Sequence, residues 1–237
     1  MRSNVVVVAI SHLLLISNTA AAQKDSVPVP TRERSPARAW IIPVGIVAST
    51  ALDPEMREWA LQTHTRSLDH FAKSVNPIGT TKRLVPAMAL TYVTALLTGR
   101  ESLANGTLKA AAAYAASDLV ESALKPMVGR ERPHVAGNSH RFQPFTANGD
   151  WHSFPSAHVA HVTSIAQAIS MQTQSGPVTA LCSSLVALVA WDRVYEDQHW
   201  MSDVTATIAL SSIVSGATVR WLESHWSRSR DAEQSAR

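Results

Sequence analysis

Six stretches of helical length, each rich in apolar residues, follow one another along this chain. Their apolar residues recur at helical spacing or run without a break, and alanine, the best helix former, dominates one of them. Long alternations of apolar and polar residues, the mark of half-buried β-strands, are missing. The sequence therefore predicts an all-α, single-domain helical bundle with buried central helices. The stretches are Pro54–Val75, with a break near Thr65, Leu84–Leu97, Thr107–Leu124, Val159–Met171, Val178–Val194 and Val204–Leu222.

The N-terminal segment has the layout of a secretory signal peptide. Arg2 precedes an apolar run from Val5 to Ile16, and small residues stand before Gln23. The chain of 237 residues is 46% hydrophobic, which suits one domain better than two. We predict a signal peptide at 1–22, a flexible leader at 23–39, the helical domain at 40–226 and a polar tail at 227–237.

The apolar stretches also raise the question of a membrane. Most are shorter than the ~20 residues that a span needs, or are interrupted by polar residues, and the mean hydropathy is close to zero. We therefore expect an exported protein, periplasmic or secreted rather than membrane-embedded, with at most transient contact with a membrane surface. The net charge of +3 comes without a basic cluster, which argues against nucleic acid as a partner. The single cysteine, Cys182, allows no intramolecular disulfide.

The first cluster of chemically active side chains lies where the alanine-rich stretch ends. Lys125 and Arg132 flank Pro126 and Gly129, two residues that end helices, so the cations would stand on or beside the following loop. Two such cations can converge on one anion. Basic side chains at a helix C-terminus are also commonly solvated, and this alternative stays open for the cluster taken alone.

The second cluster runs from Ser153 to His158, directly before an apolar stretch. Ser156 follows a proline and precedes the predicted helix, so its hydroxyl and the first backbone N–H groups would face the same space. A helix N-terminus of this kind binds phosphate. The alternative is an ordinary capping serine followed by an incidental histidine.

The third cluster contains Arg193, His199 and Asp203. His199 and Asp203 are four residues apart, so on a helical turn they share a face. Asp203 can then accept a hydrogen bond from one ring nitrogen and leave a lone pair on the other. A purely structural contact between histidine and aspartate is the alternative.

Together the three clusters read K-x6-R-P, P-S-x-H and R-x5-H-x3-D, in this order, between Lys125 and Asp203. The pattern resembles the three-part signature of the type 2 phosphatidic acid phosphatase superfamily. That superfamily includes bacterial nonspecific acid phosphatases, lipid phosphate phosphatases and vanadium haloperoxidases. The resemblance implies a metal-independent phosphatase without a cofactor, which hydrolyses a phosphomonoester, a lipid phosphate or a lipid pyrophosphate through a phosphohistidine intermediate.

The resemblance also implies a role for each residue. His199 would attack the phosphorus, Asp203 would orient His199, and His158 would protonate the leaving group and then activate water. The phosphoryl oxygens would be bound by Lys125, Arg132, Arg193, Ser156 and the N–H groups of Ala157 and His158.

Two positions depart from the usual pattern of the family. Ala157 stands where glycine is most common, and it keeps the N–H donor in a helix start, where φ is negative. Asp192 stands where serine is often found. Because a carboxylate facing the phosphate would weaken binding, we expect Asp192 to pair with Arg193 or to point away.

Three alternatives remain. A zinc site could use several histidines, but three cations around it would repel the metal. A vanadium haloperoxidase could use the same oxyanion pocket, and a helical scaffold would not need the intact catalytic set. The aromatic loop at 134–152 would either set specificity or cover the edge of the core. The candidate zinc ligands are His134, His140, His152, His158 and His161, with Asp203 as an optional further ligand.

Overall fold

The computed structural model describes residues 41–135 and 137–235, so the predicted signal peptide and leader lie outside the described residues. Within these ranges the chain forms eight α-helices and two short 3-10 helices, with one isolated β-bridge and no strand. The prediction of an all-α fold is confirmed. The helices are α3 (Ile41–Ala51), α4 (Asp53–Gln62), α5 (Arg66–Val75), η1 (Asn76–Gly79), α6 (Thr81–Leu97), α7 (Glu101–Val128), η2 (Gly149–Trp151), α8 (Ala157–Thr173), α9 (Gly176–Tyr195) and α10 (Met201–Ser235).

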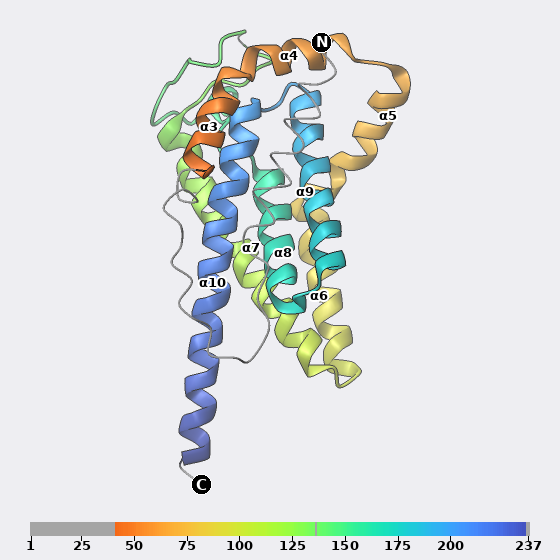
Figure 1. The fold of residues 1–237 in the computed structure, drawn as a ribbon, viewed down its shortest axis with the longest axis vertical. Helices are drawn as coiled ribbons and strands as arrows, with labels where there is room; N and C mark the ends of the chain where they lie inside the picture. The colour runs from red at the N-terminus through yellow and green to blue at the C-terminus, as the bar shows by residue number, and fades with distance from the viewer. Residues whose placement is uncertain (1–40, 136, 236–237) are drawn as a thin grey trace.

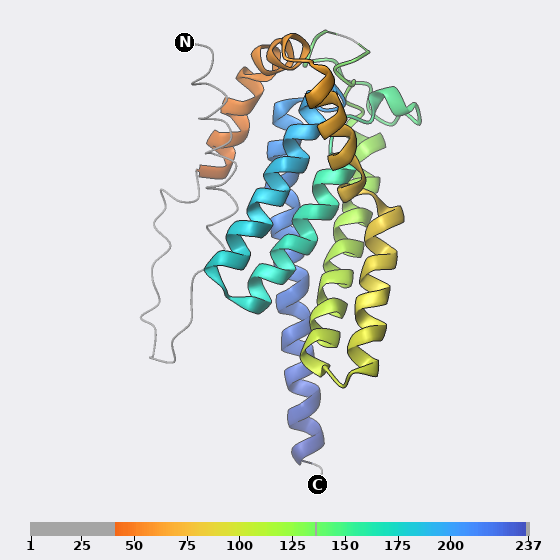
Figure 2. The ribbon, with the colours of Figure 1, turned by 90° about the vertical axis from the view of Figure 1, so that its right-hand side faces the viewer.

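Helices α7, α8, α9 and α10 form the centre of the bundle. Helix α8 packs against α7, α9 and α10, and α6 packs on the outer side of α7 (Figures 1 and 2). The main core is formed where α8, α9 and α10 meet, around Val159, Val189 and Val204, all fully buried. Close packing of such side chains adds many small dispersion contacts that hold the three helices together.

Successive helices of the bundle run in opposite directions, and this brings distant segments to one end. The C-termini of α7 and α9 and the N-termini of α8 and α10 lie at the same end, and α4 crosses over it (Figures 1 and 2). The predicted break near Thr65 is present, because the Thr65 hydroxyl caps α5 by accepting from the Leu68 N–H at 3.3 Å. At the other terminus, α10 continues to Ser235, into the segment predicted as a polar tail.

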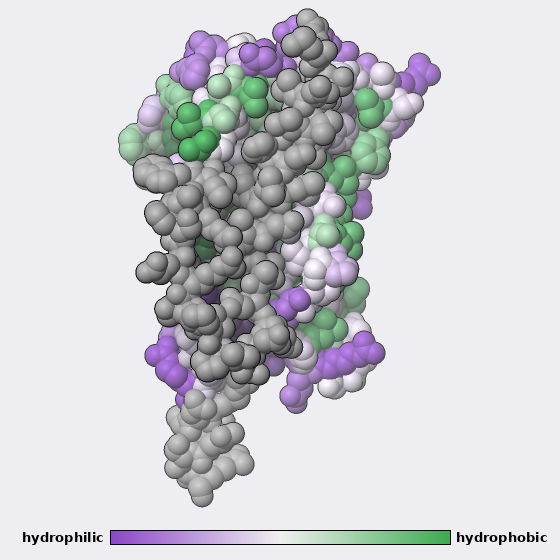
Figure 3. Space-filling view, viewed as in Figure 1, coloured by the Kyte–Doolittle hydropathy of each residue, from purple (hydrophilic) through white to green (hydrophobic). Residues whose placement is uncertain are grey.

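Besides its apolar core, the bundle has small polar residues between its helices and large apolar residues on its outer surface. Ser164, Thr207 and Ser215 are fully buried, whereas Leu97 on α6 is 83% exposed and Ile213 on α10 is 59% exposed. Hydrophobic residues recur down the right-hand flank in Figure 3, while hydrophilic residues gather towards the two ends. Small hydroxyl side chains between helices and apolar side chains outside are typical of helices packed in a lipid bilayer. Such an outer surface contradicts the expectation that the protein is not membrane-embedded.

Two of the described helices are long and apolar enough to cross a membrane. These are Gly176–Tyr195 and Met201–Arg228, and between half and two thirds of each apolar window is buried inside the bundle. Length and composition alone are weak evidence, since the core helix of a soluble protein meets the same criterion. The exposed apolar surface adds an independent observation in the same direction.

Candidate active site

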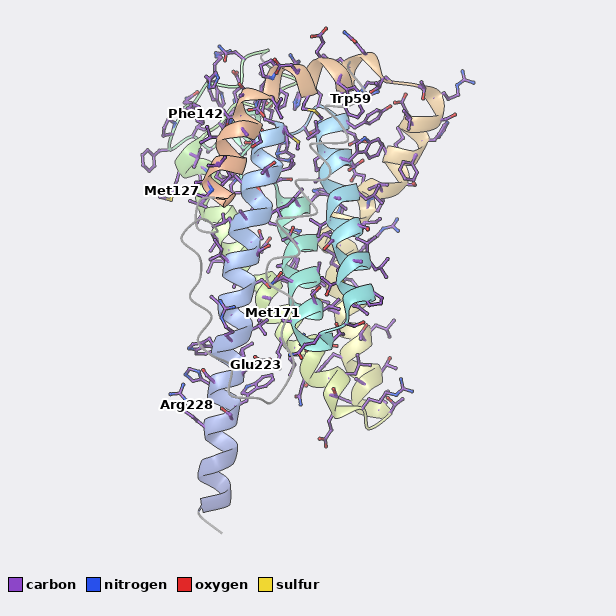
Figure 4. The ribbon with its side chains drawn as sticks, viewed as in Figure 1. Trp59, Met127, Phe142, Met171, Glu223 and Arg228 are labelled. Atoms are coloured by element: carbon purple, nitrogen blue, oxygen red, sulfur yellow. The ribbon has the colours of Figure 1, made fainter. Side chains whose placement is uncertain are left out.

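The three motifs meet at the end of the bundle that α4 crosses. Figure 4 places Trp59 of α4 and Phe142 of the 129–156 loop at this end, whereas Met171 and Glu223 lie towards the other. Electrostatic effects also show that the motifs lie close together, because the positive charges of Lys125, Arg132 and Arg193 lower the pKa values of both His158 and His199. The structure thus brings together cations and histidines from segments up to 74 residues apart, between Lys125 and His199.

The first motif is placed by the end of α7. Gly129 adopts a left-handed conformation, with φ of 58°, and a Cβ atom there would lie 1.8 Å from the Gln143 carbonyl oxygen. Only glycine fits both requirements. The helix therefore stops at this point, with Lys125 in its last turn and Arg132 on the loop.

Both cations of the first motif already have partners. Lys125 forms an ion pair with the buried carboxylate of Glu121, one turn earlier on α7. Arg132 donates to the side-chain and backbone oxygens of Gln198, at 3.1 and 3.3 Å, and to the Gly149 carbonyl at 3.1 Å. These contacts hold the cations in place, and oxyanions could share or replace them.

The second motif presents two buried polar atoms without a partner. Ser156 precedes α8 as its N-cap, yet its hydroxyl caps no backbone N–H and makes no other hydrogen bond. The same holds for Nε2 of His158, in the first turn of that helix. Since a buried polar atom left unsatisfied costs about 1–3 kcal/mol, two of them at one helix N-terminus indicate a site for a polar ligand. The first N–H groups of α8 add donors there.

The third motif contains a histidine that is held by a backbone carbonyl. His199 lies between α9 and α10, is 4% exposed, and has its Nδ1 atom against the carbonyl oxygen of Ser153. A carbonyl can only accept, so Nδ1 carries the proton and Nε2 keeps its lone pair. This lone pair could act as a nucleophile.

Asp203 does not make the predicted contact with His199. Its carboxylate accepts from Arg130 at 2.6 Å, from the Ser153 hydroxyl at 2.6 Å and from the Trp200 N–H at 3.0 Å. The reason is that α10 begins only at Met201, so His199 precedes the helix and the four-residue spacing does not place the two side chains on one face. Asp203 instead holds Ser153, whose carbonyl holds His199.

The cation of the third motif, Arg193, is shared between two carboxylates. Arg193 donates to Asp192 and, at 3.0 Å, to Glu196. Asp192 thus pairs with Arg193, which is one of the two outcomes expected for it. The pair keeps the carboxylate next to the guanidinium and fixes the direction of Arg193.

Burial and the surrounding cations keep both histidines neutral. The pKa of His199 is lowered well below its usual value by burial, and further by Arg132, Lys125 and Arg193. The pKa of His158 falls to about 4, chiefly through burial and then through Arg193 and the other cations. A neutral imidazole at His199 can act as a nucleophile, and a bound anion beside His158 would favour its protonation again.

The histidines of the alternative zinc site face different partners. Nδ1 of His134 lies 3.1 Å from the Asp197 carbonyl, and Nε2 of His152 lies 2.9 Å from the Thr146 carbonyl. His161 contacts Asp118, and His140 is exposed on the loop. Within residues 41–135 and 137–235, no three histidine, cysteine or acidic side chains form a group suited to a metal.

Sequence reasoning missed the buried network behind the site. Arg130 joins Asp203 to Asp53, the first residue of α4, at 2.7 Å, and Asp53 in turn accepts from the Ser202 N–H and hydroxyl. Arg130 could have been suspected from its place two residues before Arg132. Nothing in the sequence marks Asp53, because its role depends on how α4 crosses the end of the bundle.

Two solved structures resemble the fold of this chain. LpxE of Aquifex aeolicus has a TM-score of 0.57 and 18% identity, over 71% of this chain and 95% of that one. A transmembrane PAP2 type phosphatidylglycerolphosphate phosphatase of Bacillus subtilis has a TM-score of 0.59 and 16% identity, over 92% of this chain and 96% of that one. At this level of identity the likeness concerns the fold. A search of curated proteins finds no match to the chain.

The prediction of an exported, periplasmic or secreted protein is wrong. The fold is shared along most of its length with a transmembrane enzyme, and α9 and α10 are candidate spans. The apolar residues exposed on the outer surface agree with these findings. These observations point to association with a membrane. The short, interrupted apolar stretches did not indicate it in the sequence, because a membrane span can include buried Ser and Thr.

The family assignment follows from both the site and the sequence. The family model of the PAP2 superfamily matches residues 106–227, just over half of the chain. The matched range contains all three motifs, from Lys125 to Asp203. The chain therefore belongs to the PAP2 superfamily.

Proposed function

We propose that this protein is a membrane-associated phosphatase that hydrolyses a lipid phosphate through a phosphohistidine formed on His199. The observation that carries the proposal is the pair of buried, unpartnered atoms, Ser156 Oγ and His158 Nε2, at a helix N-terminus beside three cations. Such a set of donors and charges is complementary to a phosphoryl group and to the charge that develops on its oxygens.

The reaction takes two steps. Nε2 of His199 forms a bond to phosphorus, the phosphorus–oxygen bond to the leaving group breaks, and His158 gives its proton to the leaving oxygen. A water molecule then gives a proton to His158 while its oxygen bonds to phosphorus, and the bond to His199 breaks. Through both steps the Ser153 carbonyl accepts from Nδ1 and stabilises the positive imidazole.

Two observations favour a lipid as the substrate. The site lies at one end of a bundle whose flank carries exposed apolar side chains, so a headgroup could enter while its chains stay among lipids. The similar Bacillus subtilis protein is named as a phosphatidylglycerolphosphate phosphatase. A water-soluble phosphomonoester is the competing substrate class.

The test is phosphate release from lipid phosphates in mixed micelles, compared with water-soluble phosphomonoesters. Acid-quenched enzyme should carry an acid-labile, base-stable phosphoryl group, which His199→Ala should lack together with the activity. His140→Ala, on an exposed loop histidine, is the matched control and should keep both. A chelator should leave turnover unchanged. Loss of activity that zinc restores, or halide oxidation by vanadate-loaded enzyme that outpaces phosphate release, would contradict the proposal.

A further inference from the structure

His161 is a buried histidine to which the reaction above assigns no part. It lies on α8, three residues after His158, and is 4% exposed. Its Nε2 atom is 2.7 Å from the Asp118 carboxylate on α7, and its Nδ1 atom is 3.1 Å from the Gly79 carbonyl oxygen. A backbone carbonyl only accepts hydrogen bonds, and so does an ionised carboxylate, so with Asp118 ionised both ring nitrogens donate and the ring is an imidazolium.

The residue that His161 holds is in direct contact with His158. Gly79 packs so closely that a Cβ atom built on it would lie 2.7 Å from the Cβ of His158 and 2.9 Å from its Cα. Gly79 ends the turn η1, and the chain after it is held as well, because Tyr114 donates to the Thr81 hydroxyl at 2.9 Å. The tilted ring of Tyr114 also lies 4.6 Å from that of His161.

The same turn reaches a second residue of the site. Asn76, at the start of η1, donates to the Glu196 carboxylate at 3.1 Å, and the same oxygen accepts from Arg193 at 3.0 Å. The turn therefore stands behind both His158 and Arg193. A displacement of η1 would move the acid that serves the leaving group and one cation that binds the phosphoryl oxygens.

We propose that His161 is a positioning residue for His158: held between Asp118 and the Gly79 carbonyl, it clamps η1 against His158 and keeps a positive charge one helical turn behind that ring. The proposal rests on the proposed role of His158 as acid and base. His161 touches neither substrate nor the reacting atoms, and it acts through Gly79 and through its charge. In agreement with this, its charge is among the causes that lower the pKa of His158.

The experiment compares an alkyl phosphate with an activated aryl phosphate, using the full chain in detergent. His161→Leu should displace His158 and slow turnover of the alkyl substrate, whose leaving group needs a proton, by about 10–100-fold. This is a part of the 10²–10⁴-fold that general acid catalysis supplies. The aryl substrate should change by less than about threefold, since its leaving group needs little protonation. His64→Leu is the control, because His64 also pairs with an aspartate, Asp69 at 2.8 Å, and packs on a tyrosine, Tyr195, but is not among the charges that act on His158.

A pH profile adds a readout that simple loss of packing would not move. Lys125, Arg132, Arg193 and His161 are the charges that lower the pKa of His158. Removing one positive charge makes protonation easier, so the limb of the profile that belongs to His158 should move to higher pH in His161→Leu. Should that variant fail to fold, Asp118→Asn, at a half-exposed carboxylate, should reproduce the difference between the two substrates, because it weakens the contact that holds His161.

The outcomes separate the two proposals. An equal loss for both substrates, or none for either, would overturn the positioning role, provided that His158→Ala still discriminates between them. If His158→Ala itself does not discriminate, the acid role in the proposed function fails instead. Discrimination in both variants, with His64→Leu unchanged, supports the clamp.

Discussion

At the scale of single residues, the orientation of His199 depends on a serine that takes no chemical part. The Ser153 hydroxyl donates to Asp203, and its carbonyl accepts from His199. We expect Ser153→Ala to lower kcat about tenfold with little change in KM, because the carbonyl loses its anchor while the phosphate-binding groups stay in place. Ser215→Ala, at another fully buried serine with one hydrogen bond, is the control. An unchanged kcat in Ser153→Ala would favour direct orientation by Asp203.

The neutral histidines also predict the pH dependence. Burial and positive neighbours both disfavour the imidazolium form, so the pKa of His158 falls to about 4 and that of His199 falls well below its usual value. In the proposed reaction His158 must then take its proton from the substrate, whose second pKa is about 6. We expect kcat/KM to rise as pH falls through about 6 and to drop again where free His158, near pH 4, and then His199 become protonated. A rate that rises between pH 7 and 8 would contradict this order of protonation.

At the scale of elements, η1 and α8 approach at a glycine. Gly79→Ala would place a methyl group 2.7 Å from the Cβ of His158, so the helix start or the turn must move. We expect turnover of an alkyl phosphate to fall about tenfold or more, because general acid catalysis depends on close positioning. Gly176→Ala is the control, since a Cβ there meets nothing within 4 Å. Equal turnover in both variants would show that the contact is not needed.

Helix α4 is tied to the site by one buried carboxylate. Asp53 is 1% exposed and pairs with Arg130, which also pairs with Asp203. Removing one partner of a buried ion pair costs about 3–5 kcal/mol, because the other charge stays buried. Asp53→Ala should therefore lower the thermal unfolding midpoint clearly, as measured in detergent. Glu58→Gln, on an exposed position of the same helix, should leave it nearly unchanged.

At the scale of the whole molecule, the outer surface predicts how the protein responds to charge. Ile213 lies within a candidate span and is 59% exposed. In a bilayer an arginine there costs about 2.5–3.5 kcal/mol, whereas in water it would cost almost nothing. We expect the wild-type protein to stay with membranes after a carbonate wash, and Ile213→Arg to accumulate poorly. Leu61→Arg, at an exposed position on α4, is the control. Equal yields of both variants would contradict a lipid-facing surface.

Some of this molecule could be predicted from local sequence signals. Apolar stretches at helical spacing indicated the helices, Gly129 marked the end of α7, and Ser156 marked the start of α8. These signals suffice because capping and periodicity depend on neighbours within one or two helical turns. The order of the three motifs indicated the family for the same reason, since each motif is a short local pattern.

Only the tertiary structure decided which atoms meet and which surface faces outwards. Nδ1 of His199 pairs with the Ser153 carbonyl because the link before α10 is not helical, and a backbone carbonyl leaves no mark in a sequence. The apolar outer surface could not be recognised from the composition either. Buried Ser and Thr and the polar ends of the bundle offset the apolar flank, so the mean hydropathy is close to zero although large apolar side chains such as Leu97 are exposed. Composition averages over the whole chain, whereas contact with lipid depends on where each side chain points.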